Sequence, residues 1–164
     1  MYWSNTFQGM SPEFENIIRQ KNTTLLFAGI GNVLKSDDGV GVYITERIRN
    51  SERITSFPVE VSIENYIGKI NSLKPDILIL VDCVNMNSYP GTCKLINPDK
   101  IHDLTFNTHN ISLNRLHEFF TMPVFILGIQ PEYVGFGENI SYLVKEVADN
   151  IVQSINKQEV YYGY

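Results

Sequence analysis

A short run of apolar residues bounded by two acids places the strongest constraint on how this chain can fold. The run reads Asp76-Ile77-Leu78-Ile79-Leu80-Val81-Asp82 and contains no polar residue between the acids. A strand with one solvated face would carry polar residues at every second position. The run is therefore typical of a central parallel strand that helices cover on both faces, which predicts an α/β sheet.

The remaining segments alternate between strand and helix patterns. Further strands are expected at Leu25–Ile30, at Val59–Ile63 after the breaker Pro58, at Thr92–Ile96 as an edge or antiparallel strand, and at Val124–Leu127. Helices are expected from Pro12 to about Lys21, from near Gly39 to about Arg49, at Ile67–Leu73, after a cap at Asn110, and along a last stripe of Ile140, Leu143, Val147, Ile151 and Ile155. This order predicts a three-layer α/β/α domain with a twisted, mostly parallel (mixed) sheet.

The loop after the first strand carries two adjacent acids, Asp37 and Asp38, just before a helix. A dinucleotide-binding protein binds a phosphate at that junction, because free backbone N–H groups and the helix dipole favour an anion. The glycine fingerprint is also broken, since Leu34 stands where its third glycine belongs. The loop is better suited to a cation, although one of the two acids could instead serve as the N-cap of the helix.

Two further side chains could join these acids. Asp82 follows the central strand, and the carboxyl ends of parallel strands meet at one edge of the sheet, although a purely structural role is equally compatible with its position. Of the three histidines, His109 stands at a loop-to-helix entry, whereas His102 and His117 lie in polar surroundings. Asp38, Asp82 and His109 form a plausible set of ligands for zinc or nickel, with open positions for water or substrate.

Composition excludes several classes of protein. A net charge of -5 gives no footprint for nucleic acid and no polybasic membrane patch, and no apolar run reaches the roughly 20 residues of a membrane span. The start of the chain lacks signal-peptide features. Cys83 and Cys93, without a CxxC motif, are expected to be reduced core thiols, which favours a cytoplasmic protein.

With these positions in view, the chain resembles the maturation endopeptidases of nickel–iron hydrogenases, and most closely the branch that serves hydrogenase 3, the formate-hydrogenlyase type, with its archaeal relatives. The resemblance covers about Thr24 to Ile155. The matching segments are Gly29-Ile30-Gly31-Asn32 through Asp37-Asp38-Gly39-Val40-Gly41, Leu80-Val81-Asp82 with Pro90-Gly91, Thr108-His109-Asn110-Ile111-Ser112-Leu113, and Gly128-Ile129-Gln130-Pro131-Glu132 with Gly135.

The resemblance implies a phosphorylase/hydrolase-like fold and an enzyme that removes the C-terminal extension of a hydrogenase large-subunit precursor after nickel insertion. It implies Asp38, Asp82 and His109 as the residues that contact nickel, which the precursor itself presents; zinc or another divalent cation can take its place in vitro. Asp38, Asp82 and His109 are expected to be catalytic, with Asp37 or a free oxygen of Asp38 as the acid–base group.

Several expectations concern substrate contact and organisation. Gly31 and Asn32 in the first loop, and Glu64 and Asn65 after the second strand, are expected to touch the substrate, although Ile63 replaces the proline that the hydrogenase-3-like branch carries there. Residues 1–22 are expected to form an N-terminal extension with a short helix, residues 23–164 a single monomeric protease domain. Another metallopeptidase or amidase of the same fold, and a non-catalytic nickel-handling chaperone, remain open as alternatives.

Overall fold

A five-stranded sheet forms the centre of the molecule in the computed structural model, which describes residues 10–99, 115 and 117–159. Its strands lie in the order β2-β1-β3-β5-β4. They are β1 (Leu25–Ile30), β2 (Ile54–Glu60), β3 (Ile77–Cys83), β4 (Cys93–Ile96) and β5 (Val124–Ile129). All neighbours pair in parallel except β4, which runs antiparallel to β5 at one edge. The predicted mixed, mostly parallel sheet is confirmed.

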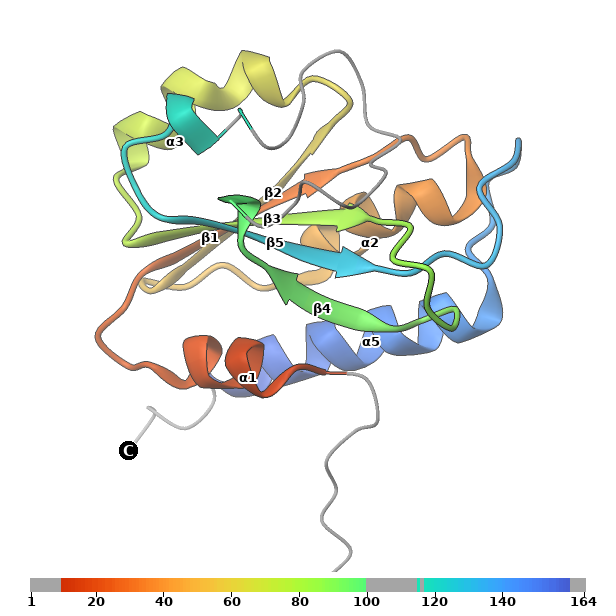
Figure 1. Ribbon diagram of the computed structural model, residues 1–164. Helices are drawn as coiled ribbons and strands as arrows, with labels where there is room; N and C mark the ends of the chain where they lie inside the picture. Colours follow the sequence, from red (N-terminus) through yellow and green to blue (C-terminus); the bar gives the residue numbers. More distant parts are fainter. Residues whose placement is uncertain (1–9, 100–114, 116, 160–164) are drawn as a thin grey trace, which may run out of the picture.

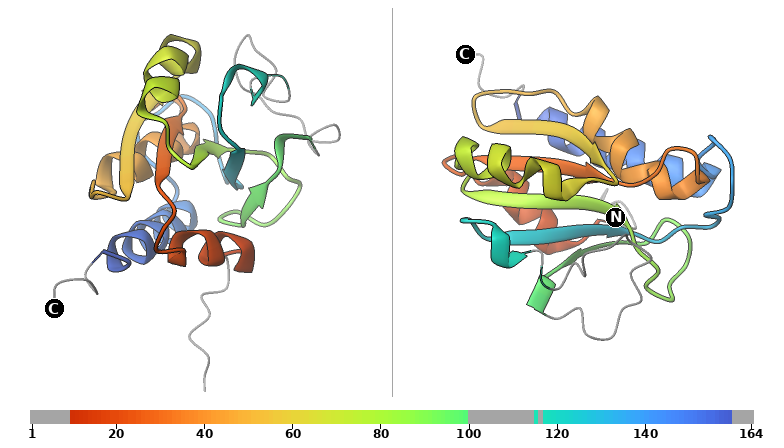
Figure 2. Two further views of the ribbon diagram at one scale, coloured as in Figure 1. Left: turned by 90° about the vertical axis from the view of Figure 1, so that its left-hand side faces the viewer. Right: turned by 90° about the horizontal axis from the view of Figure 1, so that it is seen from above.

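Helices cover both faces of this sheet (Figures 1 and 2). The helices are α1 (Pro12–Arg19), α2 (Val40–Arg47), α3 (Ile67–Leu73) and α5 (Tyr142–Lys157), with short 3-10 turns η1 (Ser36–Gly39), η2 (Ile63–Tyr66) and η4 (His117–Phe119). Side chains of α1, α2 and α5 share one hydrophobic cluster with the sheet, and α3 contributes Ile70 to a second cluster on the other face. The three-layer α/β/α expectation is therefore confirmed.

The central strand β3 supplies side chains to both clusters. Ile79 and Val81 belong to the cluster with α2 and α5, whereas Leu78 and Leu80 belong to the cluster with α3. Successive side chains of a strand point to opposite faces, so a strand covered on both sides must be apolar throughout. By the same alternation Asp82 lies on the α3 face, one residue before the strand ends.

Two expectations from the sequence need correction. The second strand begins at Ile54, not after Pro58, because β2 is an edge strand where proline's missing N–H costs no ladder hydrogen bond. In α5 the buried face consists of Val144, Ala148, Ile151, Val152 and Ile155. Leu143, expected on that face, is exposed, because the helix turns Val144 and Ala148 toward the core, where α5 packs chiefly against α2.

The N-terminal helix is part of the core. Ser11 caps it, accepting a hydrogen bond from the Phe14 amide at 3.2 Å, and the helix begins at Pro12, as the sequence predicted. Phe14 and Ile18 are fully buried in the same cluster as α2 and α5. Among the described residues, none of the helices is long and apolar enough to cross a membrane.

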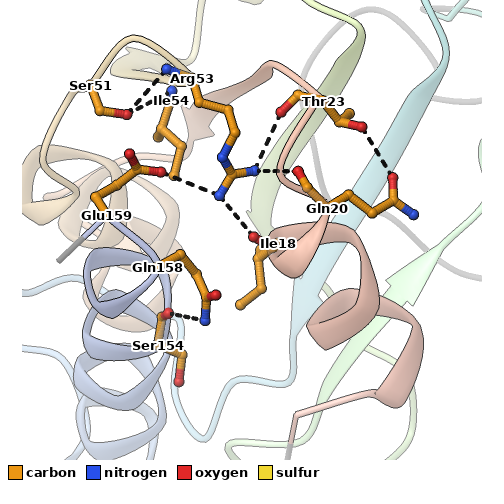
Figure 3. A network of polar contacts seen from close by, with 9 residues as sticks. All are labelled: Ile18, Gln20, Thr23, Ser51, Arg53, Ile54, Ser154, Gln158 and Glu159. Atoms are coloured by element: carbon orange, nitrogen blue, oxygen red, sulfur yellow. Dashed lines mark hydrogen bonds and ion pairs between the residues drawn. The ribbon is translucent and has the colours of Figure 1, made fainter. Parts of the chain in front are cut away.

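A single guanidinium ties this helix to the rest of the domain (Figure 3). Arg53, just before β2, donates to the carbonyl oxygens of Ile18 at 2.8 Å, Gln20 at 3.1 Å and Thr23 at 3.3 Å. The same group forms an ion pair with Glu159, just after α5, at 3.3 Å. Three segments that are distant in sequence therefore share one charged donor, which satisfies carbonyls at the end of α1.

Replacing Arg53 with Met is expected to lower the free energy of unfolding by about 2 kcal/mol, since the apolar stem remains but the charged donors are lost. Thermal unfolding followed by circular dichroism measures this as a drop of roughly 4–8 °C. Arg49→Met, at an exposed position nearby, is the matched control and should change stability by less than about 0.5 kcal/mol. Equal unfolding temperatures for the two variants would contradict the assignment.

Candidate active site

Loops at the carboxyl ends of β1, β3 and β5 come together at one edge of the sheet. In an open parallel sheet this edge is where ligands bind. The loop after β1 is joined to the loop after β5 by backbone hydrogen bonds: the Ser36 amide donates to Gly137 at 2.7 Å, and the Gly137 amide to Leu34 at 2.9 Å. The two loops therefore form one rigid frame around the expected acids.

Glycine is required at the turn that carries these acids. Gly31 has φ +138°, and a Cβ atom on it would collide with the carbonyl oxygen of Asp38. Gly41 lies so close to the sheet that a Cβ there would collide with the carbonyl oxygens of Val81 and Ile30. The absence of a side chain at these glycines lets the first turn of α2 lie against β1 and β3.

Asp38 stands at the mouth of this turn, with 8% of its surface exposed. Its Oδ2 accepts a hydrogen bond from the Asn32 amide at 2.8 Å. Its Oδ1 receives no hydrogen bond from the described part of the chain. Neither Asp37 nor Asp38 caps α2, whose N-cap is Gly39 without a side-chain bond, so the suggested capping role is wrong.

Asp37 instead holds the loop after β5. It is fully buried, and its two oxygens accept four hydrogen bonds: from the amides of Glu132 and Tyr133 at 2.9 Å each, and from the amide and hydroxyl of Ser141 at 2.7 and 2.8 Å. Such a set of donors stabilises a buried carboxylate in place of water. Because both oxygens of Asp37 already accept hydrogen bonds, this side chain is better suited to positioning the loop after β5 than to transferring a proton.

Asp82 has the opposite environment. It is fully buried, and neither carboxylate oxygen has a hydrogen-bond partner among the described residues. Burial, together with the charge of nearby Asp38, holds the pKa of Asp82 well above its ordinary value. The Cys83 amide has a smaller effect that lowers this pKa, although it forms no aligned hydrogen bond with the carboxylate. The carboxylate oxygens of Asp82 and Asp38 are donors that fit a metal ion. A divalent cation between the two acids would compensate both charges.

A cavity of about 240 Å³ opens at this point. It is lined by Asp38, Cys83, Asn85, Gln130, Pro131, Glu132, Tyr133 and Val134. Cys83 and Cys93 are free and buried, as expected from the sequence. Burial beside Asp82 and Asp38 raises the pKa of the Cys83 thiol well above its ordinary value, so the thiol stays protonated and is no nucleophile.

Gln130 organises the cavity wall, and residue-by-residue reasoning missed it. Its Oε1 accepts from the amides of Met86 at 2.6 Å and Ser88 at 3.3 Å, and its Nε2 donates to Asn85 Oδ1 at 3.2 Å. The loop after β3 is thereby held against the end of β5. The signal that could have found it is its place in the Gly-Ile-Gln-Pro segment.

The other expected site residues divide into three groups. Asn32 lies in the turn, where its Oδ1 accepts from the Leu34 amide at 2.9 Å. Glu64 and Asn65 are exposed in η2, at the same sheet edge but outside the cavity lining. His109 lies outside the described residues, and within residues 10–99, 115 and 117–159 no three His, Cys, Asp or Glu side chains form a metal-binding group.

Replacing Gly31 with Ala is expected to displace Asp38 and lower kcat/KM for the natural substrate about a hundredfold, because misplacing a site group by about 1 Å has that effect. The strained backbone should also lower the free energy of unfolding by about 1–3 kcal/mol. Gly68→Ala is the control: Gly68 lies in α3 with open space around it, so alanine should stabilise slightly. Wild-type rates in Gly31→Ala would contradict the role given to this turn.

Comparison with known proteins shows which proteins this chain resembles. The profile described as hydrogenase maturation protease matches residues 60–158. The hydrogenase 3 maturation protease of Escherichia coli K12 is 30% identical over 136 residues, covering 79% of this chain and 87% of that protein. The crystal structure of the nickel–iron hydrogenase maturation protease HycI from Thermococcus kodakarensis KOD1 superimposes with a TM-score of 0.78 at 26% identity, over 89% of this chain and 97% of that one.

A more distant structure shares the fold. The hydrogenase maturating endopeptidase HybD from Escherichia coli is 18% identical, with a TM-score of 0.66 over 85% of this chain and 94% of that one. These comparisons favour neither of the alternatives left open by the sequence, a different metallopeptidase or amidase and a non-catalytic nickel-handling chaperone.

Proposed function

Because the chain belongs to the family of hydrogenase maturation proteases, we propose that it removes the C-terminal extension from the precursor of a nickel–iron hydrogenase large subunit once nickel has been inserted. As a member of this family it is a peptidase. The partner is the precursor itself, and the reaction is hydrolysis of one peptide bond. We place the protein in the cytoplasm as a monomer, acting on a substrate that is folded around its metal.

The observation that carries this proposal is the buried, unpartnered carboxylate of Asp82 beside Asp38. Asp38 lines the cavity and Asp82 is buried close behind it, so the pair leaves a negative site that a cation would satisfy. Nickel held by the precursor supplies that cation as part of the substrate. Only a nickel-loaded precursor supplies the positive charge that compensates the two acids. The protein would therefore recognise a loaded precursor and reject an empty one.

The remaining donors are assigned by the resemblance and by geometry. His109 is the proposed third contact to nickel, and zinc or another divalent cation is expected to occupy the same acids in vitro. The Oδ1 of Asp38, which accepts no hydrogen bond from the described residues, is the proposed acid–base oxygen. Asp37 is assigned a positioning role through its four hydrogen bonds, in place of direct catalysis.

In the proposed reaction the precursor's nickel draws the scissile segment into the cavity and polarises the carbonyl or an attacking water. The water loses a proton to Asp38, its oxygen bonds to the scissile carbon, and the C–N bond breaks. The proton then passes to the departing amine, so the carboxylate is restored. Gly31 and Asn32 hold Asp38 in place, and Glu64 and Asn65 are proposed contacts to the chain on either side.

Cleavage of a nickel-loaded precursor, followed by mass spectrometry of its C-terminus, tests the proposal. The wild-type protein should release the extension, whereas Asp38→Asn and His109→Ala should each lower the rate by at least about a hundredfold. His102→Ala serves as the control for histidine loss. Normal trimming by both site variants would overturn the assignment of these residues.

A further inference from the structure

Large apolar side chains gather around the mouth of the cavity, on the frame formed by the loops after β1 and β5. We define the apolar rim as Val33 and Leu34 on the first loop with Tyr133, Val134 and Phe136 on the second. All five are exposed, from 41% for Val134 to 89% for Phe136. Of the eleven exposed large hydrophobic residues among those described, seven lie on these loops or at the adjoining start of α5. Such clustering marks an interaction site rather than scattered surface residues.

The rim is continuous with the cavity. Tyr133 and Val134 line the same cavity as Asp38. On the other side of the first loop, Val33 borders a second hollow of about 130 Å³, whose lining includes Val42 and Ile140. The rim therefore separates two hollows, one of which is lined by Asp38.

The rim is also held rigidly. Besides the bonds between Ser36, Leu34 and Gly137, the Ser36 hydroxyl donates to the Gly135 carbonyl at 2.9 Å, and Lys35 forms a parallel bridge with Gly137. The ring of Tyr133 lies against Gly135, where a Cβ atom would collide with it. A backbone fixed in this way loses little conformational freedom when a partner covers the rim.

We infer that the apolar rim is the surface on which the chain of the substrate precursor docks, with apolar side chains next to its scissile bond seated against Leu34 and Phe136. This inference rests on the proposed function. The acids and the rim have separate tasks: the acids respond to the charge of the nickel, and the rim supplies contact area for the protein around it. The exposed acids beside the rim, Glu132 and Glu138, disfavour an acidic partner segment.

Leu34→Ser and Phe136→Ser test the inference, since both positions are exposed and the changes should leave the fold intact. With the nickel-loaded large-subunit precursor from the source organism, each variant is expected to raise KM, and Kd for the immobilised precursor, about tenfold. The value of kcat should change less than twofold. Leu73→Ser is the matched control: it is a half-exposed leucine at the end of α3, on the opposite edge of the sheet, and should behave as wild type.

The outcomes separate this inference from the proposed function. If the wild type trims the precursor and the rim variants have unchanged KM and Kd, the docking surface is overturned and the function stands. If the wild type binds but does not trim, and the rim variants bind more weakly, the docking surface stands and the hydrolase assignment is overturned. If the wild type neither binds nor trims, both are overturned.

Discussion

Asp82→Asn is expected to abolish trimming of the precursor and, at the same time, to raise the unfolding temperature of the protein. The native carboxylate is fully buried without a hydrogen-bond partner and faces the charge of Asp38. A neutral amide of the same shape removes the cost of burying that charge. The gain should be about 1–3 kcal/mol at pH 7, or roughly 2–10 °C, while kcat/KM falls by at least about a thousandfold.

The stability gain should depend on pH with a definite sign. The pKa of Asp82 is raised in the folded protein, so the folded state retains a proton that the unfolded chain releases near pH 4. Below that pH both states are protonated and the two proteins should differ little. As pH rises toward the folded pKa, wild-type stability falls relative to Asp82→Asn.

Thermal unfolding of both proteins between pH 4 and pH 8 measures this difference. Asp76→Asn is the control of opposite sign, since hydrogen bonds from the Thr24 amide and hydroxyl lower the pKa of Asp76. That variant should be less stable than wild type by a constant margin across this pH range, because the stability that ionised Asp76 contributes is lost only below about pH 4. A loss of stability in Asp82→Asn at pH 7, or unimpaired trimming, would refute the role assigned to Asp82.

Asp37→Ala is expected to lower the free energy of unfolding by about 3–5 kcal/mol, the largest stability loss predicted for this chain. The substitution removes the acceptor of four hydrogen bonds and leaves the amides of Glu132, Tyr133 and Ser141 without a partner. Asp37→Asn keeps one acceptor oxygen and should lose about half as much. Urea unfolding, with the midpoint and slope compared across variants, measures the effect.

The neighbouring acid provides the control for this prediction. Asp38→Ala removes a single hydrogen bond, to the Asn32 amide, and should change stability by about 1 kcal/mol or less while abolishing trimming. The two adjacent aspartates are thus expected to separate, one affecting stability and the other activity. A midpoint for Asp37→Ala equal to that of wild type would contradict this separation.

The strands and helices were predictable where local pattern alone decides them. The ranges of β1 and α3 agree with the expectation, because continuous apolar runs and turn residues mark their ends. The start of β2 was not predictable from the sequence, since a strand can contain Pro58 only if it lies at an edge of the sheet. The buried side of α5 likewise depends on its packing against α2, a partner distant in sequence.

The site was predictable in its acids but not in their environments. Motif spacing singled out Asp37, Asp38 and Asp82, yet the donors that surround Asp37 come from a part of the chain some 95 residues away, as the bond from the Glu132 amide illustrates. The same holds for Gln130, whose partners lie 42–45 residues away. Contacts at such separations follow from sheet order, which local periodicity does not encode.

The two edges of the sheet have a consequence for how the protein behaves at high concentration. An exposed edge strand offers unpaired amides and carbonyls to another chain, which is a route to aggregation. Here β2 carries Pro58, which has no amide to offer, and β4 is only four residues long with Lys94 exposed. Both features hinder edge-to-edge pairing between molecules, so the sheet itself is protected against fibril growth while the apolar rim stays available for its partner.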